Sequence, residues 1–120
     1  MAPTTIIGQK STTTPGGREA KRDGTPIDMA RMLAIPDGSV YIERRALTTV
    51  KEIRKAKQAI LKSFRCQLEG LGFSMVELLS PCPTNWKLSP KDSWNWVNEE
   101  MQKVFPVGVI KDTTGFEETA

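Results

Sequence analysis

The sequence predicts an α/β protein with a mostly parallel sheet. Residues 39–46 form a run of β-branched and aromatic residues, residues 49–69 repeat with a helical period, and residues 73–79 form a short apolar run. A strand, a helix and a strand in this order favour a parallel pair with a right-handed crossover. At 120 residues the chain is one domain or part of one.

Signals for the first helix and the first strand begin at Thr25. Thr25 is a good N-cap, Pro26 suits the first helical position and Asp28 falls in the first turn. We therefore expect a short helix through about residue 33. A turn at 35–38 then leads into the strand at 39–46.

The long helix has a clear start and stop. Thr49 and Glu52 form a capping box, and Gly70 is a natural C-terminal stop. Apolar residues recur at spacings of three and four, which predicts one apolar stripe. The stripe consists of Ile53, Ala56, Ile60, Phe64 and Leu68.

A second helix follows the strand at 73–79, which is apolar enough to be buried on both faces. Ser89 caps this helix, Pro90 opens it and Pro106 ends it. Residues 107–110 are a candidate last strand. The apolar face of the helix consists of Trp94, Val97, Met101 and Val104.

So few strands make a thin sheet. A parallel sheet needs cover on both faces, and two strands do not supply a stable one alone. We infer a part of a larger α/β layer, completed by further sequence or by partner chains. Trp86, Trp94 and Trp96 lie within eleven residues, which favours a subunit interface.

Composition excludes several kinds of function. The chain has no His, which removes Ser–His and Cys–His catalysis. Its net charge of +3 is a mild bias, and the basic long helix makes nucleic-acid binding a weak alternative. No stretch reaches the length of a membrane span and no secretory segment is visible, so we expect a cytoplasmic protein without a membrane.

The N-terminal 25 residues are rich in Thr, Gly and Pro. On composition alone this segment is typical of a flexible polar leader. Its threonine clusters with Gly16 and Gly17 leave an anion site open as an alternative.

Two cysteines offer thiol chemistry. Cys66 lies on the long helix and reads as a small packed hydrophobe. Cys82 stands between Pro81 and Pro83 at the end of a strand, where α/β folds place ligands. From the residues alone a structural thiol is still favoured. No CxxC is present, so the chain does not build a four-thiolate site by itself.

The order of "MAPTT", "GQKSTTTPGGR", "YIERRA", "IRKAKQAI" and "SPCPTNW" resembles the C-terminal part of the β subunit of 2-oxoacid:ferredoxin oxidoreductases, over essentially all 120 residues. The resemblance implies the C-terminal part of a thiamine-diphosphate-binding domain. Residues 1–25 would lie beside the thiamine site, 26–112 would form part of the α/β domain, and 113–120 would be a tail.

The resemblance implies an activity for the complete enzyme. Such enzymes oxidatively decarboxylate pyruvate, 2-oxoglutarate or a branched-chain 2-oxoacid to its acyl-CoA and pass the electrons to ferredoxin. The implied partners are an alpha subunit, gamma or delta subunits, ferredoxin, CoA and the 2-oxoacid. The alternatives are an interaction domain without a cofactor or, more weakly, a small nucleic-acid-binding protein.

The resemblance also assigns site residues. Cys82 matches the last of the four thiolates on a 4Fe–4S cluster. Thr4 and Thr5 would make polar contacts near the thiamine pocket. The family's other cluster cysteines and its thiamine diphosphate and Mg²⁺ motifs lie upstream of these residues. We therefore expect the isolated chain to bind no cofactor and to show no activity.

Overall fold

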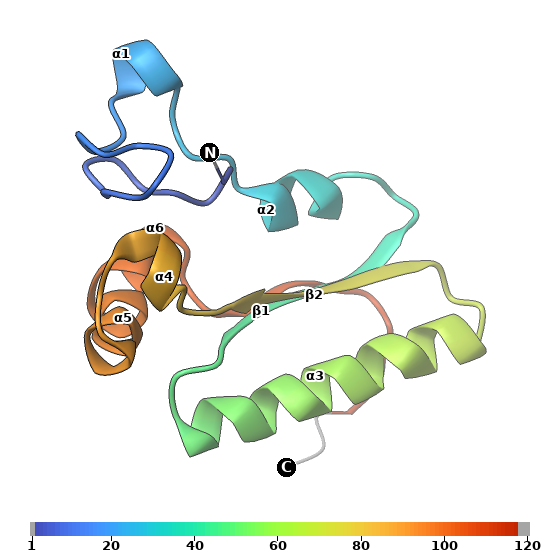
Figure 1. Cartoon of the computed structure of the whole chain (residues 1–120). Coiled ribbons are helices and arrows are strands. Elements are labelled where there is room, and N and C mark those ends of the chain that lie inside the picture. The colour runs from blue at the N-terminus through green and yellow to red at the C-terminus, as the bar shows by residue number, and fades with distance from the viewer. Residues whose placement is uncertain (1, 118–120) are drawn as a thin grey trace. The chain divides into compact units, whose positions relative to one another are not determined.

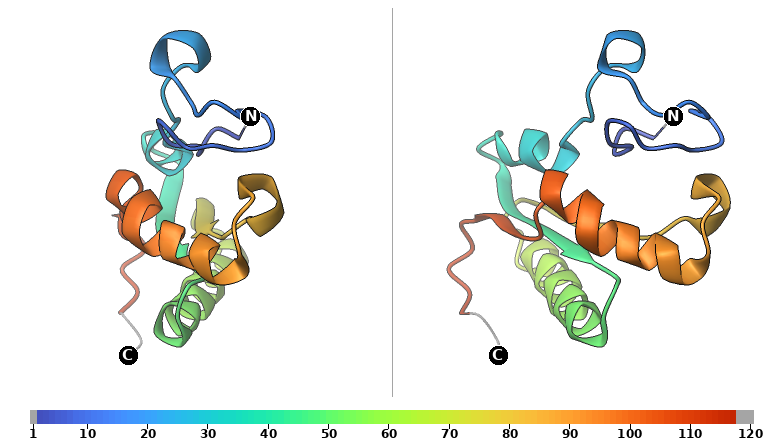
Figure 2. Two further views of the ribbon diagram at one scale, coloured as in Figure 1. Left: turned by 60° about the vertical axis from the view of Figure 1, so that its left-hand side comes forward. Right: turned by 90° about the vertical axis from the view of Figure 1, so that its left-hand side faces the viewer.

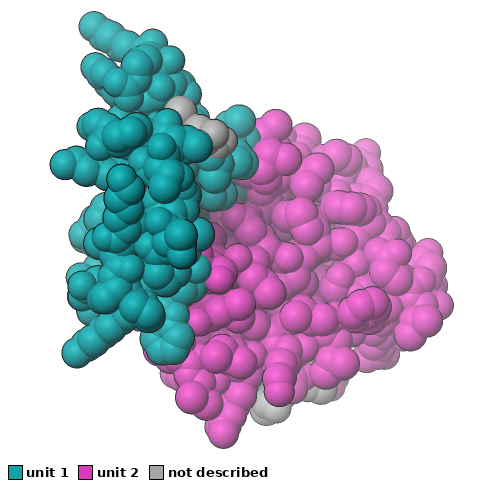
Figure 3. Space-filling model, viewed as in Figure 1, with its two compact units in different colours: residues 1–28, 81–105 teal, residues 29–80, 106–120 magenta. Residues whose placement is uncertain are grey.

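The computed structural model of the chain describes residues 2–117 (Figure 1). The chain divides into two compact units (Figure 3). We call Met1–Asp28 with Pro81–Phe105 the first unit, and Met29–Ser80 with Pro106–Ala120 the second unit. No described helix is long and apolar enough to cross a membrane.

The second unit is built on a three-stranded mixed sheet. β1 (Ser39–Ala46) lies in the centre, with β2 (Phe73–Leu79) parallel to it on one side and β3 (Gly108–Asp112) antiparallel on the other. The bounds predicted for the first two strands and their parallel pairing are confirmed. The last strand begins one residue later and ends two residues later than predicted, and its antiparallel direction makes the sheet mixed.

Helices cover both faces of this sheet. α3 (Val50–Leu68) packs on β1 and β2, and α2 (Met29–Ala34) packs on β1 and β3. Figures 1 and 2 show the two helices on opposite faces. The sheet therefore has the two-sided cover that a parallel pair requires.

The cap of α3 was predicted correctly, but the buried face only in part, since Ala56 of the predicted stripe is buried. Glu52 N–H donates to the Thr49 hydroxyl over 3.2 Å, so Thr49 is the N-cap. The side chains of α3 that are buried are small, while two residues of the predicted stripe, Phe64 and Leu68, are 64% and 88% exposed. Small side chains let a helix lie close to a sheet, so the larger apolar residues are left at its rim. The buried residues of α3 are Ala56, Ala59 and Cys66.

β2 is less buried than the sequence predicts. Only Leu79 is buried among its residues, and Phe73 is 46% exposed. The reason is its position, because β2 is an edge strand with a partner on one side only. The inference of a sheet that continues beyond these strands stays a prediction.

Charged and thiol groups lie inside the second unit. Arg44 on β1 is 1% exposed and pairs with Glu77 on β2 over 3.3 Å. Cys66 is fully buried, and this burial raises the pKa of its thiol. Cys66 is thus a packed small hydrophobe, as predicted.

The first unit contains a long N-terminal loop and short helices. The loop holds α1 (Ala20–Asp23), and the C-terminal segment forms α4 (Pro83–Trp86), α5 (Pro90–Trp96), the π-helical turn η1 (Val97–Met101) and α6 (Gln102–Val104). Asp92 N–H donates to the Ser89 hydroxyl over 3.1 Å, which confirms the predicted cap.

The predicted apolar face of this helical segment is partly right. Val97 and Met101 are buried, whereas Trp94 and Val104 are 50% and 47% exposed. The segment also contains a π-helical turn, which shifts the following side chains around the helix axis. A regular helical period therefore does not describe its whole length.

The short helix predicted from Pro26 begins only at Met29, in the second unit. Thr25 is not its cap, because the backbone before Met29 bonds elsewhere. The Thr25 carbonyl accepts from Arg18 over 3.0 Å, and Ile27 N–H donates to the Pro3 carbonyl over 3.0 Å. These contacts hold the segment in a non-helical path.

Candidate functional site

A buried arginine organises the N-terminal loop. Arg18 is 6% exposed, and its guanidinium donates to the carbonyl oxygens of Thr5 over 2.8 Å and Gly24 over 2.9 Å. The flexible leader predicted from composition is therefore wrong for the described residues. Composition misled because one side chain supplies the contacts that an apolar core would otherwise give. Its further acceptors are the carbonyls of Ala2, Pro3, Asp23 and Thr25.

A second set of hydrogen bonds closes the same loop. Ile6 N–H donates to Gln9 Oε1 over 3.1 Å, and the hydroxyls of Ser11 and Thr14 lie 2.6 Å apart. Gly17 has φ +90°, and a Cβ on it would lie 2.9 Å from the Gly8 carbonyl oxygen. The buried hydroxyls thus bond one another, which leaves the open alternative of a threonine-lined anion site without support.

The cysteine turn comes directly before α4. Cys82 is exposed, with a free thiol, and occupies the N-cap position of α4 with φ −130°. Trp86 N–H donates to the Cys82 carbonyl over 3.0 Å, and Pro81 and Pro83 flank the residue, so the backbone on both sides of the thiol is restrained. The turn presents a single sulfur on a rigid support.

The cysteine turn and the N-terminal loop are joined. Thr12 N–H donates to the Asn85 carbonyl over 3.0 Å, and the Thr12 hydroxyl donates to Asn85 Oδ1. The two residues are 73 positions apart in the chain. This contact brings the residues around Gln9 beside those that follow α4.

The predicted thiamine contacts, Thr4 and Thr5, lie on the N-terminal loop. Thr5 is buried and Thr4 is half-buried. Their role stays a prediction, as does that of Cys82. The described part of the chain holds no group of three or more His, Cys, Asp or Glu side chains suited to a metal ion.

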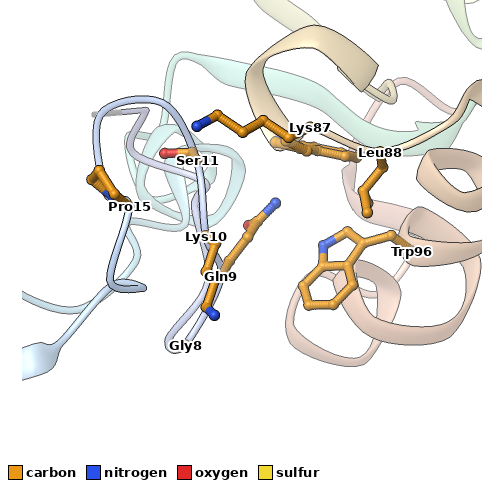
Figure 4. Close-up of a pocket in the computed structure, with 9 residues that line it drawn as sticks. Gly8, Gln9, Lys10, Ser11, Pro15, Lys87, Leu88 and Trp96 are labelled. Carbon is orange, nitrogen blue, oxygen red and sulfur yellow. The ribbon is translucent and has the colours of Figure 1, made fainter.

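A pocket of about 450 Å³ lies within the first unit (Figure 4). The N-terminal loop forms one wall, and the residues around α4 and α5 form the other. We call it the first-unit pocket. It is lined by Gly8, Gln9, Lys10, Ser11, Pro15, Trp86, Lys87, Leu88 and Trp96.

One lining residue has an unusual backbone. Lys87 has φ 54° and ψ 41°, the left-handed conformation, at the C-cap of α4. This conformation costs a non-glycine residue about 1–2 kcal/mol. It ends α4 and places Lys87 on the pocket.

Sequence reasoning singled out Trp86 and Trp96 but not Gln9, Lys10 or Lys87. No local motif marks these three residues. The proximity of Gln9 and Lys10 to the tryptophans depends on the contact between Thr12 and Asn85, which a local pattern does not reveal.

Three curated relatives match the chain. The ketoisovalerate oxidoreductase subunit VorA of Methanothermobacter marburgensis is 42% identical over 112 residues, which cover 93% of this chain and 23% of the relative. Its counterpart from Methanothermobacter thermautotrophicus is 40% identical over 112 residues, covering 93% of this chain and 24% of the relative. The 2-oxoglutarate synthase subunit KorB of Archaeoglobus fulgidus is 32% identical over 103 residues, covering 86% of this chain and 34% of the relative.

These matches cover most of this chain but only a part of each relative. The chain spans about a quarter of the length of the first two relatives and about a third of the other. No protein-family model matches the chain, and no solved structure gives a significant match. Over most of its length, the chain is homologous to subunits of 2-oxoacid:ferredoxin oxidoreductases.

Proposed function

We propose that this chain forms the C-terminal part of the β subunit of a thiamine-diphosphate-dependent 2-oxoacid:ferredoxin oxidoreductase. The observation that carries the proposal is the 42% identity to a ketoisovalerate oxidoreductase subunit over 93% of the chain. The complete enzyme would oxidatively decarboxylate a 2-oxoacid to its acyl-CoA. Two of the three relatives are named for ketoisovalerate, which favours a branched-chain 2-oxoacid.

Cys82 would supply one thiolate to a 4Fe–4S cluster. An exposed sulfur on a restrained backbone suits a ligand that meets others from elsewhere. Cysteine thiolates hold such clusters, which pass electrons singly. The remaining ligands would come from other parts of the complete subunit.

Thr4 and Thr5 would lie beside the thiamine diphosphate, with its Mg²⁺ held by other parts of the subunit. The N-terminal loop gives both residues a defined position, because the Arg18 guanidinium donates a hydrogen bond to the Thr5 carbonyl. Bound thiamine diphosphate would supply the electron sink for decarboxylation.

The proposed partners are the other subunits of the same enzyme and ferredoxin, in the cytoplasm. Exposed apolar side chains in both units support subunit contacts. Trp94 is 50% exposed in the first unit, and Leu61 is 62% exposed in the second.

The proposal is tested by purifying the tagged chain from its source with its bound partners. We expect co-purified subunits and a CoA-dependent reduction of ferredoxin by a 2-oxoacid. A chain that carries no such subunits and gives no activity with any of the three 2-oxoacid classes would refute the proposal.

The thiol is tested in the same assembly. Cys82→Ser is expected to lower the iron content and abolish ferredoxin reduction, because one cluster ligand is lost. Cys66→Ala is the matched control, since its sulfur is buried and is not a proposed cluster ligand. An unchanged brown chromophore in Cys82→Ser would refute the ligand role.

The second candidate is an interaction domain without a cofactor. Exposed apolar residues on α3 favour it, with Val50 67%, Phe64 64% and Leu68 88% exposed. A stable complex that contains neither thiamine diphosphate nor iron would support this candidate over the enzyme. No specific observation favours nucleic-acid binding. Three basic residues of α3 already form ion pairs with carboxylates, namely Lys55, Lys62 and Arg65.

A further inference from the structure

The walls of the first-unit pocket combine apolar surface with hydrogen-bond donors. Apolar surface comes from Trp86, Leu88 and Trp96. The volume of the pocket, about 450 Å³, falls within the usual range for small-molecule sites. A lone inorganic ion would leave most of this space empty. The pocket therefore suits an organic molecule.

One donor at the pocket is buried without an acceptor, and the amide group of Gln9 lines the same pocket. The indole N–H of Trp96 is shielded from solvent and donates to no atom in the described part of the chain. Gln9 is 3% exposed, and its Oε1 already accepts from Ile6 N–H, which directs the amide nitrogen elsewhere. Figure 4 shows the nitrogen-bearing edge of Trp96 on the side of the ring that faces Gln9.

A hydrogen bond that a buried donor fails to make is costly. A buried N–H without an acceptor loses its bond to water and gains nothing in return. The side-chain oxygens of the lining already have partners, since Gln9 Oε1 accepts from Ile6 N–H and the Ser11 hydroxyl lies 2.6 Å from that of Thr14. The pocket thus offers donors to a ligand that must bring the acceptors.

The charge at the pocket has one sign. Lys10 and Lys87 line it, and no Asp or Glu does. Neither lysine forms an ion pair with a carboxylate in residues 2–117. Positive charge beside a buried donor without an acceptor favours an anion.

We propose that the first-unit pocket binds an organic anion, a carboxylate or a phosphate ester with an apolar body. The apolar body lies against Trp86 and Leu88. An acceptor oxygen binds the Gln9 amide and the Trp96 indole N–H, and a lysine, Lys10 or Lys87, pairs with the anionic group.

The proposal uses neither Cys82 nor Thr4 and Thr5, and it does not depend on the proposed function. Binding requires no cluster, no thiamine diphosphate and no turnover. Cys82→Ser is therefore expected to leave ligand binding unchanged, even where it abolishes activity of the assembled enzyme.

The test is a titration of the full 120-residue chain. Binding is monitored through the NMR signals of the indole N–H groups. The probes are 3-methyl-2-oxobutanoate, adenosine 5′-phosphate, adenosine and inorganic phosphate. We expect at least one of the two organic anions to shift the Trp96 signal saturably. Adenosine and inorganic phosphate should bind about tenfold or more weakly, because each lacks one half of the recognition.

The two organic anions distinguish the source of the charge. Tighter binding of 3-methyl-2-oxobutanoate assigns a carboxylate ligand, and tighter binding of adenosine 5′-phosphate assigns a phosphate ester. If neither shifts the Trp96 signal at millimolar concentration, the proposal is overturned.

Variants locate the site. Lys10→Gln with Lys87→Gln should weaken binding about tenfold or more, since whichever lysine pairs with the anionic group is lost. Lys91→Gln is the matched control, because Lys91 is an exposed lysine of α5 outside the pocket. Equal affinity of the double variant and the wild type, or a saturable shift at Trp94 instead of Trp96, would overturn the proposal.

Trp96→Phe distinguishes the contribution of the indole N–H to binding from that of the aromatic ring. It keeps an aromatic wall and removes the indole N–H, so affinity for the preferred anion should fall while that for adenosine stays the same. The indole N–H signal of Trp86, which also lines the pocket, reports binding to this variant. A fall in affinity for both would indicate loss of the wall and would contradict the role of the donor.

Discussion

The two units of this chain provide hydrogen-bond partners for their backbone groups in different ways. In the second unit β1 pairs with β2 and β3 along backbone ladders, each with one register shift, and α3 closes its own hydrogen bonds. In the first unit the N-terminal loop has little regular structure, and Arg18 donates to six of its carbonyl oxygens. Regular pairing needs only a local pattern, whereas the loop needs one particular side chain.

Two buried arginines make the comparison concrete. Arg18 in the first unit is 6% exposed and bonds to carbonyl oxygens, while Arg44 in the second is 1% exposed and pairs with the Glu77 carboxylate. Carbonyl oxygens satisfy a guanidinium without a second buried charge. A loop that buries little apolar surface, with Ile6 as its buried apolar side chain, is ordered in this way.

The largest effect is expected from Arg18→Met. The substitution keeps an unbranched apolar side chain but removes every donor, so several carbonyl oxygens lose their partner at a cost of about 3 kcal/mol. Urea unfolding measures the loss. Amide exchange should accelerate at Thr5 and Ile27, whereas the amides of β1 and β2 keep their protection.

Arg22→Met is the control, because the Arg22 side chain is 56% exposed. It should cost far less than Arg18→Met. If Arg18→Met accelerates exchange equally throughout β1 and β2, the two units unfold as one and the comparison fails.

A glycine pair tests both units with the same change. In Gly17→Ala the new Cβ would lie 2.9 Å from the Gly8 carbonyl oxygen, and in Gly72→Ala it would lie 2.6 Å from that of Gly38. Both glycines have positive φ. Each substitution should destabilise by about 2 kcal/mol in chemical denaturation, since neither neighbour is a flexible side chain.

Gly16→Ala is the matched control for Gly17→Ala, because nothing lies within 4 Å of the position that its Cβ would take. It should be close to neutral. A neutral Gly17→Ala would show that the N-terminal loop yields freely and is less ordered than the hydrogen bonds indicate.

The helix caps sharpen the comparison at a smaller scale. Thr49→Ala in the second unit and Ser89→Ala in the first each remove a hydroxyl acceptor from an N-terminal N–H, at a cost of about 1 kcal/mol. Thr25→Ala should stay within about 0.5 kcal/mol, because Thr25 caps no helix. Thermal or urea unfolding checks all three, and a Thr25→Ala loss equal to the others would restore Thr25 as a cap.

The smallest effect is a pH dependence in α1. Hydrogen bonds from Arg22 and from Glu19 N–H lower the pKa of Asp23 from 3.8 to about 2. A depressed carboxyl pKa contributes stability above the unfolded value, and this contribution is lost as the pH falls from about 4 toward 2. The carboxyl carbon signal of Asp23 measures the pKa, and Asp23→Asn should remove this part of the pH dependence.

Asp112 in the second unit is the counterpart. Burial raises its pKa, but hydrogen bonds from Lys62 and Thr114 outweigh burial and lower it overall. Its stabilisation is therefore also lost on acidification below about 4. If Asp23 titrates at its ordinary value while Asp112 does not, the hydrogen bonds of α1 are not formed in solution.

Local patterns in the sequence determined much of the second unit. The strands at 39–46 and 73–79, their parallel pairing and the start of α3 at Thr49 all follow from β-branched runs, a helical period and a capping box. Each of these signals lies within a few residues. The resemblance to the oxidoreductase subunits also rests on the sequence alone.

Only the tertiary structure decided how the first unit is ordered and which side of α3 is buried. The N-terminal loop depends on Arg18 reaching carbonyl oxygens up to 16 residues away, and the pocket depends on Thr12 meeting Asn85 across 73 residues. On α3 the sheet takes the small side chains and leaves Phe64 and Leu68 exposed. Composition and period describe what a segment contains, whereas burial and pairing depend on what it meets.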